Sequence, residues 1–385
     1  MRKNIRVLHL ASFNGNIGDV ANHAGARALF SQYLDFDLVI TELEIREFYW
    51  GLRAFDDAFV SYANQFDLLL IGGGNYFELW VDKSATGTSI DISAAQLQAL
   101  SVPTAFYSLG VDTGQGCSTT AARRFRAFMD TVLSRKDIFV CVRNDGSSLA
   151  LSEVLGSRYS TMVPVMPDGG FFAGSTLMEQ EVICRNERKI IAINLAGDML
   201  DRRFNASLSS EAFLAEFASS CTQVLNENGD IDMEFVPHIW RDTQVIAQIL
   251  PLFPDSLLRS RIRVAPLYAS PGGLNIFLMT YKRASLVLGT RFHANVCPIG
   301  MGVPTRGLLN YPQVSHLYRE LDISERLVDI RNVGFGELLV TQVNNDLSEN
   351  EMDRDRYKEC SDQLRDAAAN VLNKMNSWLH NVLVC

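Results

Sequence analysis

Short apolar runs alternate with amphipathic segments along roughly the first 170 residues. The apolar runs predict strands, and the segments between them predict helices. The predicted strands cover 5–11, 37–41, 67–74, 104–114, 137–145 and 161–170, and the predicted helices cover 20–34, 91–100 and 121–135. Apolar, β-branched runs separated by helices are typical of a parallel sheet that is covered on both faces.

A polar stretch at 175–188 interrupts this rhythm, which starts again at residue 189. Further strands are predicted at 189–197, 232–238, 261–265, 285–289 and 304–309, and a long helix at roughly 350–380. We therefore predict an α/β protein with two Rossmann-like open-sheet domains facing a cleft. The predicted parts are an N-terminal domain at 1–174, a linker at 175–188, a C-terminal domain at 189–349 and a C-terminal helix at 350–385.

Composition narrows the class of protein. The chain has 385 residues, of which 47% are hydrophobic and 21% charged, as expected for a globular protein. Its seven cysteines are scattered without a CxxC pair, which argues against a disulfide framework and against a zinc or other metal site. The net charge of −9 and the lack of a basic block argue against a nucleic-acid partner.

No apolar stretch reaches the roughly 18 residues that a membrane helix needs. The first apolar run, 5–11, is short and contains Arg6 and His9, so it predicts a strand and not a signal peptide. We expect a cytoplasmic protein without a transmembrane segment. Peripheral contact with a membrane stays open.

Residues that could carry chemistry follow the predicted strands. In open α/β sheets, ligands bind beyond the carboxyl ends of the strands, so these residues are expected to line a site. The candidates are Asn16, Gly18 and Asp19 after the first strand, Gly73, Gly74, Asn75 and Trp80 after another, then Arg143, Asp168, His238, Arg291, His293 and Tyr311.

The stretch LVLGTRFHANVCPIGMGVP, residues 286–304, gives the strongest signal. It places Arg291 and His293 in apolar surroundings directly after a buried strand, with Thr290 predicted to cap the following helix. A buried arginine needs an anion. We expect a phosphate or carboxylate of a ligand opposite Arg291; the alternative is an aspartate in a structural network.

The other candidates also have plain structural explanations. Asp19 could be a first-turn carboxylate that favours the helix dipole, and Arg143 could pair with a neighbouring aspartate. Asp168 could belong to a Pro-Asp-Gly turn, and His238 could be a satisfied buried histidine. The IGGGNYF segment lacks GxGxxG, so it is a weak cofactor motif but a good loop for close backbone approach.

Taken together, the motifs resemble those of the polysaccharide pyruvyl transferase family. The matching segments, in order, are NIGDVANHAGARAL, DLLLIGGGNYF, SLGVDTG, VRNDGSSLAL, MPDGGFF and LGTRFHANVCPIGMGVPTRGLLNY. Two features depart from the family pattern. Pro298 falls inside a segment that is usually an uninterrupted helix, and Asn144 separates Arg143 from Asp145.

The resemblance implies a fold like that of GT-B glycosyltransferases and transfer of pyruvate from phosphoenolpyruvate, a co-substrate, to a sugar as a ketal. The acceptor would be a sugar of a polysaccharide or a lipid-linked saccharide, and no further cofactor is expected. By position, Arg291 and His293 match the family's R-x-H in the phosphoenolpyruvate site, Asp19 the acidic residue of the N-terminal turn and Arg143 the V-R-D arginine.

Chemistry suggests roles for these residues. His293 suits the general acid and Asp19 the base that deprotonates the sugar hydroxyl. The carboxylate and phosphate of phosphoenolpyruvate need at least two cationic anchors, for which Arg291 is the first candidate and Arg143 of the facing domain the second.

The resemblance puts phosphoenolpyruvate on the second domain, so the first should hold the acceptor. Its candidate ligands are Asn75, Tyr76, Phe77 and Trp80; the alternative is that these aromatic residues simply cover the edge of the sheet. Two other functions stay open: a GT-B-type glycosyltransferase using a nucleotide-sugar, and a non-catalytic sugar-phosphate binding protein.

Overall fold

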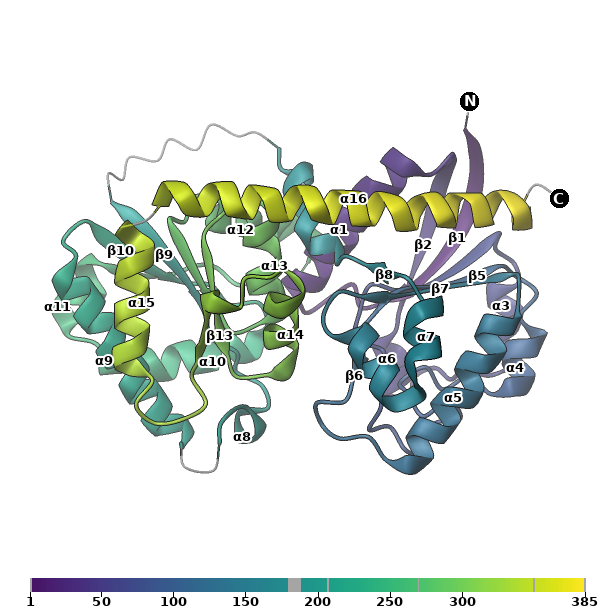
Figure 1. The fold of residues 1–385 in the computed structure, drawn as a ribbon, viewed down its shortest axis with the longest axis horizontal. Helices are drawn as coiled ribbons and strands as arrows, with labels where there is room; N and C mark the ends of the chain where they lie inside the picture. Colours follow the sequence, from purple (N-terminus) through teal and green to yellow (C-terminus); the bar gives the residue numbers. More distant parts are fainter. Residues whose placement is uncertain (1, 179–187, 206–207, 269, 349, 384–385) are drawn as a thin grey trace. The chain divides into compact units, whose positions relative to one another are not determined.

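The computed structural model describes residues 2–178, 188–205, 208–268, 270–348 and 350–383 (Figure 1). The chain forms two compact units. The first unit comprises 1–13, 26–169 and 364–385, and the second comprises 14–25 and 170–363. The predicted first domain included 14–25, which lie in the second unit. Of the predicted linker, residues 179–187 lie outside the described residues.

The first unit is built on a six-stranded sheet in which every neighbouring pair is parallel. Every residue of its strands β3 (Leu68–Gly72) and β5 (Thr104–Leu109) is buried, because helices cover both faces of the sheet centre. In spatial order the strands are β2 (Phe36–Glu44), β1 (Lys3–Ala11), β3 (Leu68–Gly72), β5 (Thr104–Leu109), β7 (Ile138–Arg143) and β8 (Val165–Met166).

Capped amphipathic helices follow these strands. Asp56, Ser93 and Ser118 each accept a backbone hydrogen bond at a helix start, which satisfies an amide that the helix itself leaves unpaired. The helices are α2 (Arg46–Tyr49), α3 (Asp57–Ala63), α4 (Ala94–Ala99), α5 (Thr119–Ser134), α6 (Ser147–Leu155) and α7 (Ser157–Met162). A small parallel pair, β4 (Phe77–Glu78) and β6 (Val111–Asp112), lies outside the main sheet.

The second unit repeats this plan with another six-stranded parallel sheet. In spatial order its strands are β11 (Ile262–Val264), β10 (Ile231–Phe235), β9 (Lys189–Asn194), β12 (Leu286–Gly289), β13 (Thr305–Leu309) and β14 (Leu327–Asp329). The strand order reverses between β9 and β12, since β10 and β11 extend the sheet on one side and β12 to β14 on the other. This is the topological switch point of the sheet.

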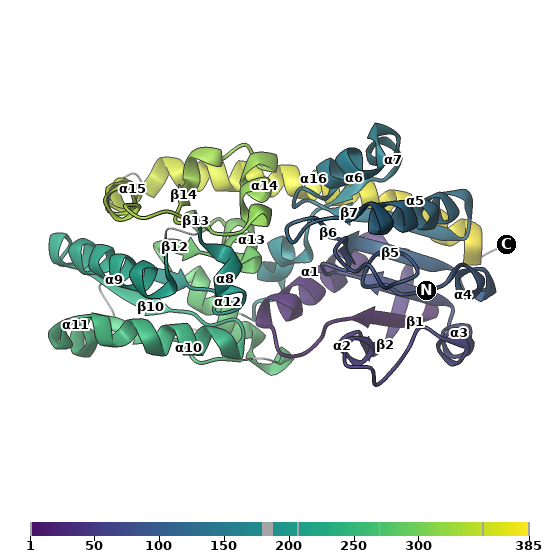
Figure 2. The same cartoon turned by 90° about the horizontal axis from the view of Figure 1, so that it is seen from below.

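Side chains of the second sheet alternate between two cores. Ile191 and Leu288 pack with α9 (Ser210–Glu227), α10 (Trp240–Ile249) and α15 (Gly336–Ser348). Ala192 and Val287 pack with α12 (Leu274–Lys282), α13 (Phe292–Gly300) and the start of α1 (Ile17–Tyr33). The ribbons of these helices are labelled in Figure 2. The helical elements are η1 (Gly169–Thr176), α8 (Leu200–Arg203), α9 (Ser210–Glu227), α10 (Trp240–Ile249), η2 (Leu250–Leu252), α11 (Asp255–Ser260), η3 (Pro271–Gly273), α12 (Leu274–Lys282), α13 (Phe292–Gly300), α14 (Pro312–Glu320), η4 (Ser324–Arg326) and α15 (Gly336–Ser348).

Two helices have residues in both units. They are α1 (Ile17–Tyr33), and α16 (Asn350–Leu383), whose last residues belong to the first unit. There Asn376 donates to Asp35 over 2.7 Å, and Trp378 donates to the carbonyl of Lys136 over 2.9 Å. The predicted C-terminal helix therefore returns to the first unit. None of the described helices is both long and apolar enough to cross a membrane.

Candidate active site

The switch point of the second sheet brings two loops together. Strands β9 and β12 pair in parallel, so the loop after Asn194 and the turn at Thr290 lie side by side. Thr290 Oγ1 donates to the carbonyl of Asn194 over 3.0 Å and accepts from the amide of Ala196 over 2.8 Å. The side-chain oxygen of Asn194 accepts from the amide of Arg291 over 3.1 Å. Neutral hydrogen bonds thus position the arginine.

The prediction that Thr290 caps the next helix is wrong. The residue at the N-cap of α13 is Arg291, whose backbone is extended, and the Thr290 hydroxyl is used by the loop after β9. A hydrophobic strand followed by a helix start could not reveal this partner, because it lies 94 residues away in the chain. The helix continues through Pro298 and ends two residues later at Gly300.

Arg291 is held by two aspartates. Its Nε donates to Asp242 Oδ2 over 2.8 Å, and its Nη2 donates to Asp242 Oδ1 and, over 2.7 Å, to Asp198 Oδ1. Burial is the largest influence on Asp242 and opposes its ionisation, but the hydrogen bonds and charge of Arg291 together with the hydrogen bond from the His238 amide lower the pKa of that carboxyl. The aspartate partner that the structural explanation of Arg291 expected is therefore present. Arg291 Nη1 donates to no residue in the described part of the chain.

A second arginine joins this cluster. Arg203 Nε donates to the carbonyl of Asp198 over 2.7 Å, and its Nη2 lies 3.1 Å from Asp198 Oδ1. Its Nη1 donates to Asn310 Oδ1 over 3.1 Å, and its guanidinium lies 5.8 Å from the ring centre of Tyr311. The sequence patterns did not identify Asp198 and Arg203 as candidate site residues. Both follow the strand predicted at 189–197, at the sheet edge where ligands bind.

His293 lies beside Asp19. Its Nδ1 is 4.0 Å from Asp19 Oδ1, an ion-pair distance longer than a hydrogen bond. The turn before Asp19 is shaped by Asn16, whose side-chain oxygen accepts from the amide of Gly18 over 3.0 Å. A Cβ on Gly18 would fall 2.6 Å from the Cβ and Nδ1 of His293, so only glycine lets the imidazole pack here. Asp19 and His293, which are far apart in the sequence, thus lie close together within the second unit.

His238 is buried under the same cluster. Its ring is completely enclosed, and Nε2 lies 2.7 Å from the hydroxyl of Tyr281. Its backbone amide donates to Asp242 Oδ2 over 2.9 Å, and its carbonyl accepts from the amide of Ile17 over 3.2 Å. Desolvation lowers the pKa of His238 to about 3. His238 is therefore a buried, hydrogen-bonded histidine, as the structural explanation expected. Substrate binding by His238 stays a prediction.

The remaining candidates lie in the first unit. Arg143 is buried and paired, with Nε donating to Asp145 Oδ2 over 2.8 Å and Nη1 to Asp168 Oδ2 over 3.3 Å. The side-chain oxygen of Asn144 accepts from the amide of Asp168 over 2.9 Å. Asn144 therefore links the turn at Asp168 to the end of β7. Arg143 has the carboxylate partners that its structural explanation expected.

The glycine-rich strand end makes a tight backbone approach. Gly72 has a φ of +152°, and a Cβ there would fall 1.9 Å from the carbonyl of Tyr107. The amide of Gly73 donates to that carbonyl over 2.9 Å, and a Cβ on Gly74 would meet the ring of Tyr76 at 2.3 Å. These glycines are required by packing within the unit.

Asn75 follows directly and presents a polar edge. Its Nδ2 donates to Asp112 Oδ2 over 2.8 Å, whereas its buried Oδ1 accepts from no described residue. Of the aromatic candidates that follow, Tyr76 and Phe77 are buried in the core of the unit, whereas Trp80 is half-buried. A carbonyl oxygen and an aromatic ring are the groups that recognise sugar hydroxyls and sugar faces.

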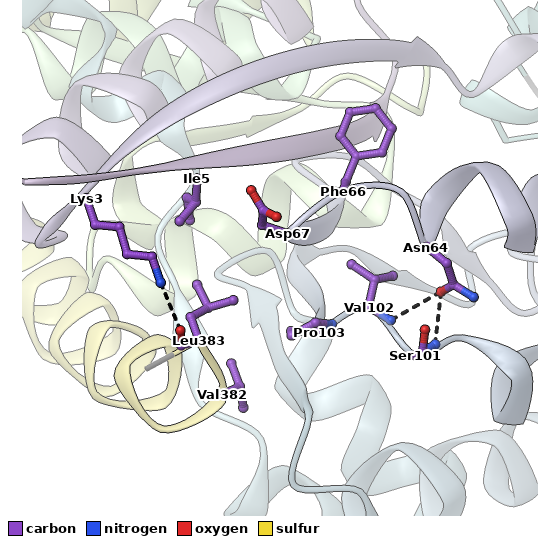
Figure 3. Close-up of a pocket in the computed structure, with 10 residues that line it drawn as sticks. All are labelled: Lys3, Ile5, Asn64, Phe66, Asp67, Ser101, Val102, Pro103, Val382 and Leu383. Carbon is purple, nitrogen blue, oxygen red and sulfur yellow. Dashed lines mark hydrogen bonds between the residues drawn. The ribbon is translucent and has the colours of Figure 1, made fainter. Parts of the chain in front are cut away.

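A pocket of the first unit lies at the other edge of its sheet. It is lined by residues at or before the amino ends of β1, β3 and β5 and by the end of α16 (Figure 3). Lys3 Nζ donates to the carbonyl of Leu383 over 3.0 Å, and Asn64 Oδ1 accepts from the amides of Ser101 and Val102. The Lys3 and Asn64 side chains that line the pocket thus form hydrogen bonds between segments of the unit.

Among the described residues, no group of three or more His, Cys, Asp or Glu could hold a metal.

Comparisons with known structures identify the fold. A putative UDP-N-acetylglucosamine 2-epimerase from Listeria monocytogenes matches with a TM-score of 0.60 and 11% identity, covering 99% of this chain and 97% of its own. S. aureus MnaA with UDP matches with a TM-score of 0.59 and 11% identity over 99% and 98%. A glycosyltransferase from Rickettsia africae gives 0.56 and 9% over 99% of each chain. These likenesses confirm a GT-B-like fold of two open-sheet domains.

Sequence comparison is more specific. No curated protein matches the chain. The family model described as polysaccharide pyruvyl transferase matches residues 16–311, which include the turn at Asp19, the glycine-rich strand end and the Arg291–His293 segment. The match covers well over half of the chain. The chain therefore belongs to the polysaccharide pyruvyl transferase family and is a transferase.

Proposed function

We propose that this enzyme transfers pyruvate from phosphoenolpyruvate to two hydroxyl groups of a saccharide, forming a cyclic ketal. The observation that carries the proposal is the start of α13 at the switch point of the second sheet. Arg291 is the N-cap of this helix, His293 lies in its first turn, and Asp19 Oδ1 lies 4.0 Å from His293 Nδ1. An anion anchor, an imidazole and a carboxylate are together the groups that this reaction needs. Family membership supports the same assignment.

The proposed reaction balances without a cofactor. A proton adds to the methylene carbon of phosphoenolpyruvate, which becomes the methyl group and leaves a cationic carbon bearing the carboxylate and the phosphate ester. One sugar hydroxyl attacks that carbon and loses its proton. The carbon–oxygen bond to phosphate then breaks, the second hydroxyl attacks and loses its proton, and inorganic phosphate leaves. One hydroxyl proton replaces the one used on carbon, and the other leaves with phosphate or water.

His293 is the proposed general acid, and Asp19 is the proposed base that takes the hydroxyl proton. Their separation of 4.0 Å puts both groups within reach of one reacting centre. Arg291 is the proposed anchor for the anionic groups of phosphoenolpyruvate. Its Nε and Nη2 donate to Asp242 and Asp198, and its Nη1 donates to no residue in the described part of the chain.

We propose that the acceptor binds the first unit, where Asn75 and Trp80 follow the glycine-rich strand end. Asn75 Oδ1 can accept from a sugar hydroxyl, while Asp112 orients the amide through its Nδ2. A free sugar or a lipid-linked saccharide presents the same hydroxyl pair, and the lipid-linked form would bring the enzyme to a membrane surface. Because phosphoenolpyruvate is made inside cells, the proposal places the reaction in the cytoplasm.

Ligand-dependent melting separates this function from its alternatives, because a ligand that binds only the native state raises the melting temperature. The titration uses phosphoenolpyruvate, UDP and UDP-N-acetylglucosamine. Stabilisation by phosphoenolpyruvate, together with phosphate release when a saccharide mixture is added, supports pyruvyl transfer. Stabilisation by the nucleotides alone overturns it in favour of a glycosyltransferase. Binding of phosphoenolpyruvate without phosphate release from any saccharide tested overturns it in favour of a binding protein.

A further inference from the structure

Two guanidinium groups, of which that of Arg203 is buried and that of Arg291 partly buried, converge on one carboxylate oxygen in the second unit. Arg291 Nη2 lies 2.7 Å from Asp198 Oδ1, and Arg203 Nη2 lies 3.1 Å from the same atom. The side chains of Arg291 and Arg203 are 13% and 6% exposed, whereas that of Asp198 is 27% exposed. Of these three side chains, the Asp198 carboxylate is therefore the most exposed to solvent, and the two guanidinium groups are less exposed.

The location of the cluster matches where a ligand is expected. Asp198 lies on the loop after β9, Arg291 follows β12, and the strand order reverses between these two strands. Crevices beyond the carboxyl ends of strands at such a point are the ligand sites of open α/β sheets. Asn310 and Tyr311, which contact Arg203, follow β13 at the same edge.

The two aspartates of the cluster differ in how they are held. Asp242 binds Arg291 through both of its oxygens, also accepts from the amide of His238, and has no exposed side-chain surface. Asp198 uses one side-chain oxygen for both arginines. Asp242 is therefore the permanent partner of Arg291, and Asp198 is the partner that can be replaced.

The charges of the four side chains balance, so the cluster as it stands has little attraction for a further anion. Withdrawal of Asp198 would leave a net positive charge on two preorganised guanidinium forks, the geometry that binds carboxylate and phosphate oxygens. Arg203 would remain oriented by Asn310 through Nη1, and Arg291 by Asp242.

We propose that Asp198 is a placeholder for substrate, and that an anionic group of phosphoenolpyruvate replaces its carboxylate between Arg203 and Arg291. Arg203 is then a second cationic anchor in the same unit as Arg291. This inference rests on the proposed function for the identity of the anion. The placeholder itself requires only a small ligand that carries a carboxylate or phosphate.

The test is calorimetric binding of phosphoenolpyruvate to the full chain and to its Asp198→Asn variant. While the Asp198 carboxylate occupies the site the ligand cannot bind, so the apparent Kd is the intrinsic Kd divided by the fraction of time that the site is open. Removing this competitor should lower Kd by about threefold to tenfold. Asp255→Asn is the matched control, since it removes an aspartate paired with Arg259 on the surface of the same unit. That variant should bind as the wild type does.

Two further variants complete the design. Arg203→Gln should raise Kd by about tenfold or more through loss of a charge-assisted contact, and Arg203→Lys should recover part of that loss. In the double variant Asp198→Asn with Arg203→Gln, the tightening should disappear. An unchanged or weaker affinity in Asp198→Asn overturns the placeholder, and this half-exposed position makes a folding failure easy to exclude by melting.

The outcome for the proposed function is read separately. If the wild-type chain binds no phosphoenolpyruvate, the proposed function fails, and the same variants are compared with inorganic phosphate as the probe. Tighter phosphate binding by Asp198→Asn then still supports a placeholder at an anion site. Equal phosphate binding by both chains, or none by either, overturns it.

Discussion

Arg291 and Asp242 form a two-point ion pair beneath the switch point of the second sheet, with Nε and Nη2 donating to the two carboxylate oxygens. The Asp242 side chain has no exposed surface. Removing one member of such a pair leaves a buried charge without compensation, whereas removing both does not. The pair is therefore a strong determinant of how stable the second unit is, separate from any part Arg291 has in binding.

Replacing Asp242 with Ala should lower the free energy of unfolding by about 3 kcal/mol, because Asp198 would then be the one carboxylate shared by the guanidinium groups of Arg291 and Arg203. Chemical denaturation of the variant and the wild type measures it. In the double variant Asp242→Leu with Arg291→Met the loss should be clearly smaller. If the single and double variants lose equal stability, the pair does not act as a unit.

His293→Ala should reduce turnover by about 100-fold or more, the typical contribution of a general acid, while phosphoenolpyruvate still binds. Phosphate release measures turnover, and the melting midpoint is expected to stay near that of the wild type. Asp19→Asn should likewise reduce kcat more than it raises KM. Turnover at a tenth of normal or higher in His293→Ala would remove His293 from the mechanism.

Gly18→Ala should impair catalysis by displacing the imidazole, since the added Cβ would fall 2.6 Å from His293 Nδ1. We expect kcat to fall by about tenfold or more, because small misplacements of a catalytic group are costly. Gly229→Ala is the control, as nothing lies within 4 Å of a Cβ built there. Wild-type kcat in Gly18→Ala would show that the contact does not position His293.

Acid should destabilise the protein through His238, because burial lowers its pKa to about 3. The unfolded chain, with an ordinary histidine pKa of about 6.5, then binds more protons than the native chain between these values, so stability falls as pH falls through that window. At about pH 5 the loss attributable to this residue is about 2 kcal/mol relative to neutral pH.

The measurement compares unfolding free energies at about pH 7 and about pH 5 for the wild type and for His238→Gln, which keeps a polar partner for Tyr281. The variant should lose less stability between the two pH values. Burial raises the pKa of Glu78 to about 7, which favours the native state as pH falls, and both proteins share this opposing effect. Equal pH dependence in the two proteins would contradict the assignment.

Trp80→Ala should raise KM for the saccharide acceptor far more than KM for phosphoenolpyruvate. Loss of a stacking face typically costs about 1 kcal/mol or more, so we expect about fivefold or more on the acceptor KM. Trp50→Ala is the matched control, because Trp50 is an exposed tryptophan of the same unit. Equal effects of Trp80→Ala on both substrates would show that the loop after the glycines is structural.

Local sequence pattern determined where the strands lie along the chain and which candidate residues follow them. Runs such as 67–74 and 285–289 are apolar and β-branched enough to predict buried strands, and both strands are present as β3 and β12. Because ligand-facing residues in this fold follow strand ends, the same pattern located Asp19, Arg291 and His293. The ordered motifs then identified the family that the family model confirms.

Tertiary structure alone decided which groups meet. Arg291 pairs with Asp242 and Asp198, which lie 49 and 93 residues away from it in sequence. The loop after β9, whose Ala196 amide donates to the Thr290 hydroxyl, is equally far from Thr290 in sequence. These contacts exist because β12 pairs with β9 and not with a strand nearer in sequence. Hydrophobic periodicity specifies that a strand is buried but not which strand it pairs with, so the ion pairs across a sheet edge follow from the strand order.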